Sequence, residues 1–254
     1  MRAISVNERD GQGAFMSIYH ELTKLGIFDN ITTAAGYRFV FRKTLDSLPQ
    51  GGTVLDWGCG DGRFTYFLLR NGMRVTAYSI VDNLKIGTEL RTQWPAQFTY
   101  VLHKDPRTLP FAAETFDAVF SIGVLEHVRE TGGDELASLA ELKRVLKPNG
   151  KLFCFHLPRK WSWIENLIRV LRLRRHRHQY LYSRRDVVQL LDGSGFQLID
   201  MGRYSALPRL ILSALPNFMK NSGWFCTAYN FADGMLAAAL PFLTQNIFFI
   251  ASKR

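Results

Sequence analysis

The chain has 254 residues, of which 47% are hydrophobic and 21% charged. These proportions suit one large α/β domain with a substantial core and exclude a disordered or fibrous chain. The formal net charge is +10, and residues 159–185 alone hold nine Lys or Arg against one acid, Glu165. Any polyanion or anionic surface is therefore expected to meet this segment.

The cysteines and the apolar runs indicate the compartment. Cys59, Cys154 and Cys226 are odd in number and widely spaced, which predicts reduced thiols in a cytosolic setting, with neither disulfides nor a metal site. No apolar stretch of a secretory signal follows the first residues. The longest uncharged run, residues 235–252, contains a proline, which favours a helix followed by a strand over a membrane span.

The first fifty residues predict two helices. Apolar side chains follow helical spacing through residues 15–25, namely Phe15, Ile18, Tyr19, Leu22 and Leu25, which predicts a capping helix. Residues 37–48 predict a second helix that ends before Pro49.

A glycine-rich stretch follows the first predicted strand. Residues 53–55 are a short apolar run, and after them come Asp56 and then Gly58, Gly60 and Gly62 at every second position. Glycine permits positive φ and close approach of a ligand. The spacing differs from the Gly-x-Gly-x-x-Gly fingerprint of dinucleotide sites, and an acid stands where a phosphate would approach. The stretch therefore predicts a ligand with a cationic group and disfavours a nicotinamide dehydrogenase.

Strands and helices then alternate. Strands are predicted at residues 74–80, 97–103, 116–122 and 151–157, and helices at residues 63–70, 82–91 and 133–146, with Asp82 as the N-cap of the second of these helices. This alternation predicts a parallel, doubly wound sheet.

The glycine stretch resembles the first motif of the class I S-adenosylmethionine (SAM) methyltransferases. Residues 103–111, 116–128 (with Leu-Glu-His at the exit of a strand) and 141–150 resemble three further motifs of that family, in the family's order. The resemblance covers residues 37–157, and residues 183–200 and 246–253 resemble the fold's last helix and last two strands. It implies a Rossmann-like, seven-stranded, mostly parallel sheet with helices on both faces, an N-terminal helical cap, a helical insertion before the last strand, and SAM as cofactor.

This resemblance divides a single domain, residues 1–254, into segments. Residues 1–48 are the N-terminal helices, and residues 49–157 the SAM-binding core. Residues 158–182 are a basic amphipathic insertion. Residues 183–254 complete the domain and contain an apolar insertion at residues 204–245.

The resemblance also assigns cofactor contacts: Asp56, Gly58, Cys59, Gly60, Gly62, Ser79, Ile80, Asp105, Pro106, Ser121 and Ile122. Asp56 would lie near the methionine portion and Asp105 at the adenine, while Ser121 and Ile122 would border the methyl group. Ser79 departs from the family, which has an acid there for the ribose. A hydroxyl bonds ribose without charge assistance, so Asp82 is an alternative.

The proton acceptor is left open among three places: Glu126-His127, His156 and His178. Histidine titrates near neutrality but is usually structural. His127 lies in a segment that the family shares, His156 ends the fifth strand, and His178 stands where family members acting on small molecules place a histidine.

The insertions predict the acceptor. No Asn-Pro-Pro-Tyr follows the fourth strand, and in this superfamily that absence disfavours amino-group methylation and favours small-molecule or lipid acceptors. In residues 158–177, Trp161, Ile164, Ile168 and Leu171 predict the apolar face of a basic helix, either on an anionic membrane surface or as a lid. Residues 204–245 carry only three charges and predict a lid, a membrane-facing hairpin or a packed helical subdomain.

The resemblance and the insertions together predict a SAM-dependent methyltransferase. It would act on an oxygen or carbon of a hydrophobic or lipid-linked small molecule, in the cytoplasm or at the inner membrane face. One alternative is an RNA-directed enzyme that uses residues 159–185, but few aromatics interleave the arginines, so nucleic acid is not the expected partner. Another, suggested by Ser79, is a non-catalytic subunit that binds SAM.

Overall fold

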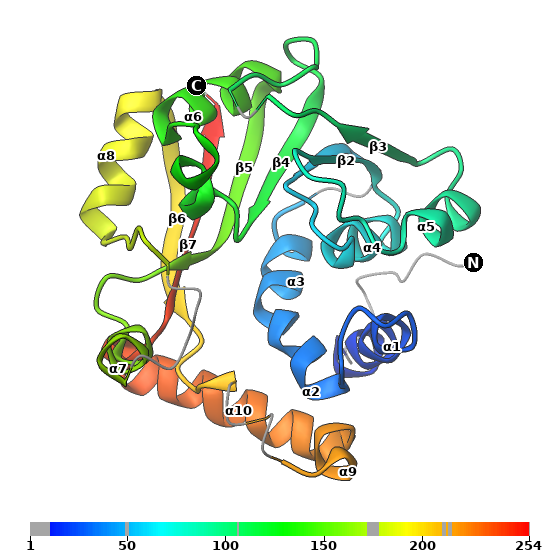
Figure 1. Cartoon of the computed structure of the whole chain (residues 1–254), viewed down its shortest axis with the longest axis vertical. Coiled ribbons are helices and arrows are strands. Elements are labelled where there is room, and N and C mark those ends of the chain that lie inside the picture. The colour runs from blue at the N-terminus through cyan, green and yellow to red at the C-terminus, as the bar shows by residue number, and fades with distance from the viewer. Residues whose placement is uncertain are drawn as a thin grey trace.

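The computed structural model describes residues 11–48, 51–105, 107–171, 178–209, 212 and 215–253 (Figure 1). Its sheet has seven strands in the order β3-β2-β1-β4-β5-β7-β6. The strands are β1 (Thr53–Trp57), β2 (Arg74–Ser79), β3 (Phe98–Leu102), β4 (Phe116–Ile122), β5 (Leu146–Pro158), β6 (Phe196–Tyr204) and β7 (Asn246–Lys253). The pairs from β3 through β5 are parallel, and β7 runs antiparallel to β5 and β6. The predicted Rossmann-like sheet is confirmed.

Helices cover both faces of this sheet. They are α1 (Gly11–Lys24), α2 (Ile31–Ala34), α3 (Arg38–Leu45), α4 (Arg63–Arg70), α5 (Gly87–Gln93), α6 (Glu135–Val145), α7 (Trp163–Leu171), α8 (Arg184–Ser194), α9 (Asn217–Lys220) and α10 (Gly223–Ala239). Figure 1 shows α6 and α8 on one side of the strands and α3 and α4 on the other.

Alternate residues of the central strands feed two separate cores. Val54 and Phe120 belong to the core under α1, α3 and α4, whereas Leu55 and Val119 belong to the core under α6 and α8. A strand points successive side chains to opposite faces, so a strand buried on both faces has a continuous apolar run. The glycine stretch therefore begins from a strand that is fixed on both sides.

The N-terminal helices belong to the first core. Phe15, Ile18, Tyr19 and Leu22 of α1 are all buried, as their spacing predicts. In α3, Phe41 stacks on Phe67 of α4 with ring centroids 3.9 Å apart. This packing holds the N-terminal segment beside the helix that follows the glycine stretch.

Two local predictions are wrong. Helix α5 begins at Gly87 with Ile86 at its N-cap, so Asp82 caps no helix, and its Oδ1 instead accepts a hydrogen bond from the Tyr100 hydroxyl at 3.3 Å. Helix α7 begins at Trp163, so Trp161 precedes it and is 66% exposed. Ile164 of the same predicted apolar face is buried.

Arg159 does not belong to the exposed basic surface that the charge of residues 159–185 predicts. Its side chain is only 6% exposed, and Nη1 donates to the carbonyls of Pro241, Phe242 and Thr244 at 2.7–3.1 Å. Arg159 therefore does not face a polyanion. The densest part of the basic run, residues 172–177, lies outside the described residues, as does Pro106.

The apolar insertion forms α9, α10 and a short 3₁₀ helix (Pro241–Leu243) before β7. The helix followed by a strand that residues 235–252 predict is confirmed. Within the described part of the chain, no helix combines the length and apolar character that crossing a membrane requires. The three cysteines are buried and unpaired.

Candidate functional site

A cavity of about 390 Å³ opens at the carboxyl ends of β1 and β4, where ligands of doubly wound sheets bind. Its lining comprises Tyr37, Asp56, Gly58, Cys59, Gly60, Asp61, Arg63, Phe64, Asn83, Lys85, Ile122 and Gly123. The structure thus brings together five of the predicted cofactor contacts: Asp56, Gly58, Cys59, Gly60 and Ile122.

The three glycines of the motif have positive φ but differ in what surrounds them. A Cβ on Gly58 would lie 2.5 Å from Val124, and one on Gly62 would lie 2.8 Å from Leu84. A Cβ on Gly60 would meet nothing within 4 Å. Gly58 and Gly62 therefore permit close packing of the glycine stretch against Val124 and Leu84, and Gly60 leaves the cavity open for a ligand.

Asp56 is the buried acid at the base of the cavity. It is 1% exposed, and its Oδ2 accepts a hydrogen bond from Thr65 Oγ1 at 2.6 Å. Burial, with a smaller contribution from the nearby charge of Asp61, raises the pKa of Asp56 to about 7 although the Thr65 hydrogen bond acts to lower it. A ligand cation beside this carboxyl would favour its ionised form.

Arg63 and Asp61 also line the cavity, and the sequence did not predict either as a site residue. Arg63 Nε donates to Asp61 Oδ1 at 2.8 Å, and Nη2 pairs with Oδ2. The guanidinium also lies 4.7 Å from the ring centroid of Phe28 and 5.6 Å from that of Tyr37, within cation–π range. The sequence signal is an Arg directly after the last glycine, a position whose helical spacing predicts only a helix residue.

The ribose side of the site is built differently from the family pattern. Ser79 Oγ donates to the Val81 carbonyl at 2.6 Å and accepts from the Val81 N–H at 3.2 Å, so its hydroxyl is used within its own turn. Asn83 and Lys85 line the cavity in its place. Ile80 packs against the second core. Ribose contacts from Ser79 or Asp82 stay predictions.

Asp105 lies outside the cavity lining. Its Oδ1 accepts from the Arg107 N–H and its Oδ2 from Thr108 Oγ1, both at 2.9 Å. These bonds, the backbone one foremost, hold the pKa of this exposed carboxyl below its usual value. Its adenine contact therefore stays a prediction. Ser121 is buried beneath the cavity, one residue before Ile122.

His156 is held in a strained, half-buried position beside Tyr204 of β6. Its φ is +61°, which is costly for a residue with a Cβ. The Tyr204 hydroxyl accepts the His156 backbone N–H at 2.7 Å and lies 2.9 Å from Nδ1. The hydroxyl is free to donate its own proton to Nδ1, and in that arrangement the ring proton is on Nε2, which has no partner among the described residues.

Burial lowers the pKa of His156 to about 3, so the ring is neutral at physiological pH. The Tyr37 ring, which lines the cavity, lies 5.0 Å away edge-on. These features favour a hydrogen-bond donor over a proton acceptor at His156.

Glu126, His127 and His178 form a second group. Burial raises the pKa of Glu126 to about 7, and its Oε2 has no partner within the described chain. Its Oε1 would lie 3.6 Å from a Cβ on Gly123, a cavity-lining residue. His127 Nδ1 is 2.8 Å from Glu130 Oε2, and the His127 and His178 rings are 5.6 Å apart.

Potential ligand atoms of these three residues lie within 4.8 Å of one another, which is the spacing of a candidate metal site. The cysteine spacing gave no sign of it. Glu126 lies beside the cavity-lining Gly123 and has the titration range of a proton acceptor.

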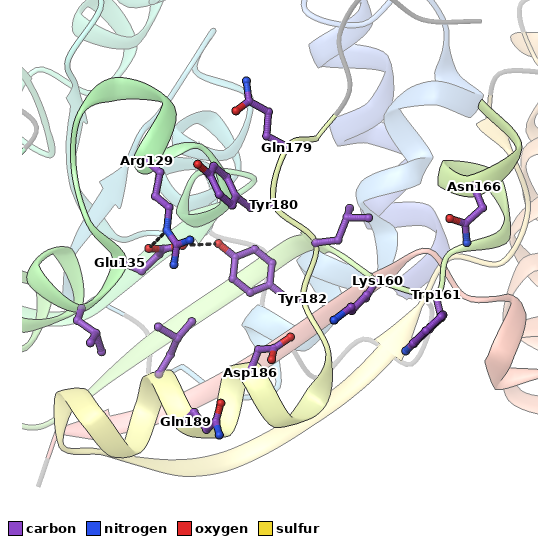
Figure 2. Close-up of a pocket in the computed structure, with 13 residues that line it drawn as sticks. Arg129, Glu135, Lys160, Trp161, Asn166, Gln179, Tyr180, Tyr182, Asp186 and Gln189 are labelled. Atoms are coloured by element: carbon purple, nitrogen blue, oxygen red, sulfur yellow. Dashed lines mark hydrogen bonds and ion pairs between the residues drawn. The ribbon is translucent and has the colours of Figure 1, made fainter. Parts of the chain in front are cut away.

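A larger hollow of about 680 Å³ lies between α6 and α8 (Figure 2). Its central groups pair with one another: Arg129 Nε donates to Glu135 at 2.5 Å, and the Tyr182 hydroxyl donates to Glu135 at 2.9 Å. Asp186 closes the capping box of α8 with Ser183. These partners give the polar groups a structural role, so volume alone does not make this hollow the site.

Comparison with known proteins identifies a methyltransferase domain in the central part of the chain. Residues 55–154 match the family described as "Methyltransferase domain". The chain is 36% identical over 110 residues to the 2-methyl-6-phytyl-1,4-hydroquinone methyltransferase of Synechocystis sp., covering 42% of this chain and 33% of that protein. It is 34% identical over 110 residues to a ubiquinone biosynthesis O-methyltransferase of Xanthomonas oryzae pv. oryzae, covering 43% and 44%.

A tRNA (carboxymethyluridine(34)-5-O)-methyltransferase of Arabidopsis thaliana is 34% identical over 106 residues, covering 42% of this chain and 24% of that protein. The chain therefore matches less than half the length of each of these relatives.

Solved structures show the same fold. The 1,6-didemethyltoxoflavin-N1-methyltransferase of Burkholderia thailandensis, which holds 1,6-didemethyltoxoflavin and S-adenosylhomocysteine, aligns with a TM-score of 0.55 at 18% identity over 95% of this chain and 86% of that one. A SAM-dependent methyltransferase from Aquifex aeolicus aligns with a TM-score of 0.55 at 16% identity over 94% and 98%. Residues 55–154 therefore match a methyltransferase-domain family, and the sheet order is that of the fold seen in these solved methyltransferases.

Proposed function

We propose that this protein transfers a methyl group from SAM to an oxygen or carbon of a hydrophobic or lipid-linked small molecule. The observation that carries the proposal is the cavity at the ends of β1 and β4, where Gly60 keeps open space beside the buried Asp56. A buried acid beside a glycine cradle suits the cationic methionine portion of SAM better than a phosphate.

The residues at the site would mainly align and shield the reactants. When bound, SAM supplies a methyl group on a positively charged sulfur. Asp56 would hold the methionine end, and Ile122 and Gly123 would border the reacting atoms. Glu126 would take the proton of an acceptor hydroxyl, and His156 Nε2–H would hydrogen-bond the acceptor.

Apolar residues on the insertions support the hydrophobic acceptor. The α9–α10 region exposes large apolar side chains: Phe218, Trp224, Phe231, Met235, Leu240 and Phe242. Helix α7 exposes Trp163, Leu167 and Val170, the last at 77%. Clusters of exposed apolar side chains mark ligand, membrane or partner surfaces. The names of two relatives include quinone-type acceptors, and an anionic membrane face would present such a substrate.

A second candidate is RNA methylation. It is favoured by the tRNA-modifying relative and by the positive charge of residues 159–185. The burial of Arg159 removes one of the charges on which that reading depends.

Calorimetric titration with SAM and with NAD tests the cofactor. We expect micromolar binding of SAM and none of NAD. Labelled methyl transfer from SAM is then measured into an organic-solvent lipid extract and, separately, into total RNA. Label in the extract supports the proposed acceptor class, whereas label in RNA alone replaces it with the second candidate. Binding of NAD without SAM ends both.

SAM affinity is expected to rise with pH around neutrality. The pKa of Asp56 is raised to about 7 in the free protein, so below that pH the carboxyl is neutral and the ligand cation must displace its proton. Affinity should rise up to about tenfold per pH unit below pH 7 and level off above it.

Calorimetry from pH 5.5 to 8 measures this dependence, and Asp56→Asn is the control. The variant should bind SAM weakly and lose the rise, while any titration of SAM itself persists in both proteins. A wild-type affinity that is flat across this range contradicts the assignment.

The same pKa carries a stability consequence. The folded protein binds the Asp56 proton more tightly than the unfolded chain, so this residue's contribution to stability is fully present below pH 4 and is lost as pH rises through 7. Bound SAM, by favouring the ionised form, would offset that loss.

A further inference from the structure

A second cavity, of about 500 Å³, lies between α3, the end of β6 and α10. Four arginines line it: Arg38, Arg42, Arg203 and Arg209. Tyr204, whose hydroxyl contacts His156, lines it too. The cavity therefore adjoins Tyr204, the hydrogen-bond partner of the residue expected to meet the acceptor.

The charge of these arginines is not neutralised within the described chain. No described carboxylate lies within 4.0 Å of any of the four guanidiniums. Asp233, the acid in the lining, uses its Oδ1 to accept the N–H groups of Ala206 and Leu207 at 2.8 and 2.7 Å. Clustered guanidiniums without acidic partners are a site for a phosphate or other anion.

Gly36 shows that the position of Arg209 is built into the fold. A Cβ on Gly36 would lie 2.0 Å from Arg209 Nη1 and 2.3 Å from its Cζ. The guanidinium thus lies against bare backbone, where Nη1 donates to the Thr32 carbonyl at 3.3 Å. Its charge also lies 5.9 Å from the centroid of the Tyr229 ring. Both partners are neutral, so they orient the guanidinium without neutralising it.

One wall of the same cavity is apolar. Helix α10 contributes Phe231, Met235, Ala237 and Ala238, and Phe231 and Met235 are 67% and 56% exposed. A free phosphate has no apolar part that could pack against such a wall. A molecule with an anionic group and a hydrocarbon part satisfies both the arginines and the wall.

We propose that this cavity binds the phosphate headgroup of an anionic membrane lipid, with the hydrocarbon chain lying along α10. The proposal deepens the proposed function, on which it rests, by assigning a lipid site beside the acceptor position. Since Tyr204 separates this cavity from His156, a lipid held here would set the protein on the bilayer with the active site turned toward it.

The test is a vesicle flotation assay with the full chain. Neutral phosphatidylcholine vesicles are compared with vesicles that contain phosphatidylglycerol and with vesicles that contain oleate at the same surface charge. We expect the phosphatidylglycerol vesicles to bind at least about tenfold more tightly than either of the others. Soluble glycerol phosphate is the arm that separates a lipid from a free phosphate.

Two variants locate the binding. Arg38→Gln with Arg42→Gln removes two charges, whereas Gly36→Ala keeps every charge and only displaces the flexible end of Arg209. Both should lower phosphatidylglycerol binding about tenfold. Their controls are Arg91→Gln, on the distant α5 (Figure 1), and Gly223→Ala, whose Cβ makes an ordinary 3.5 Å contact with Met16. Both controls should bind as the wild type does.

Gly36→Ala is the decisive variant because it changes no charge. If the whole basic surface were simply attracted to the bilayer, this variant would bind vesicles as the wild type does. The proposal is overturned if Gly36→Ala and the double arginine variant both bind phosphatidylglycerol vesicles as tightly as the wild type does. It is also overturned if the wild type binds oleate and phosphatidylglycerol vesicles equally. Tight binding of glycerol phosphate without vesicles replaces the lipid with a soluble phosphate and also overturns it. SAM titration is a separate readout that is applied to the wild type and to each variant. If the wild type binds the vesicles but does not bind SAM, the proposed function is wrong and the lipid site is still supported.

Discussion

Gly60→Val is expected to lower SAM affinity by about a hundredfold or more, a loss of about 3 kcal/mol. The Cβ position of Gly60 points into the open cavity and meets no atom within 4 Å. The valine methyl groups would therefore occupy space that the ligand needs, without displacing any part of the protein. Calorimetric titration with SAM measures the loss.

Valine also strains the backbone at Gly60, where φ is +53°. Gly72→Val is the matched control, because Gly72 has φ +82° and a Cβ there would also meet nothing within 4 Å. Gly72 lies in the turn after α4, outside the cavity lining. Both variants should lose about 1–3 kcal/mol of stability, and only Gly60→Val should lose SAM. Equal SAM affinities in the two variants would show that the ligand does not approach Gly60.

The fold was predictable because its signals are local. Burial of β1 and β4 on both faces follows from their apolar runs, and the acid-glycine spacing is read directly from nine consecutive residues. Helix α5 was misplaced for a local reason as well. Asp82 has the chemistry of an N-cap, but the chain continues as a loop to Ile86, and Asp82 is bonded instead by Tyr100 from the next strand.

The candidate site was predictable only where the backbone itself forms it. Gly60 and Asp56 belong to one strand–turn–helix unit, so their neighbours are fixed by sequence. The pair of Tyr204 and His156 joins β6 to β5 across 48 residues, and Arg209 reaches Gly36 from across 173 positions of the chain. Such contacts depend on how the insertions fold back, which residue spacing does not encode.

Arg159 shows the same limit for charge. Counted along the sequence it is one of nine basic residues in residues 159–185. In the fold it directly follows β5 and faces the turn that leads from α10 to β7. A side chain with five donors suits that turn because several carbonyls converge there.

Arg159→Met is expected to destabilise the protein by about 3 kcal/mol. Methionine fills much of the same volume but removes the bonds to the Pro241 and Phe242 carbonyls and leaves the buried Thr244 carbonyl without this donor. A buried acceptor without a partner costs about 1–3 kcal/mol. For a domain of this size the melting temperature should fall by roughly 6–12 °C. Thermal unfolding followed by circular dichroism measures the change.

Lys160→Met is the matched control, since Lys160 is the next residue in the chain and is exposed. It removes the same formal charge but should change stability by no more than about 0.5 kcal/mol. Limited proteolysis adds a local readout, because loosening of the turn at Pro241–Leu243 should expose α10 to cleavage in the Arg159 variant alone. If the two variants have the same melting temperature, Arg159 contributes only charge and the insertion is held by its apolar contacts. If only the Arg159 variant has a lowered melting temperature, the first arginine of the basic segment holds α10 in place. It then also positions the apolar wall of the cavity that Arg38, Arg42, Arg203 and Arg209 line.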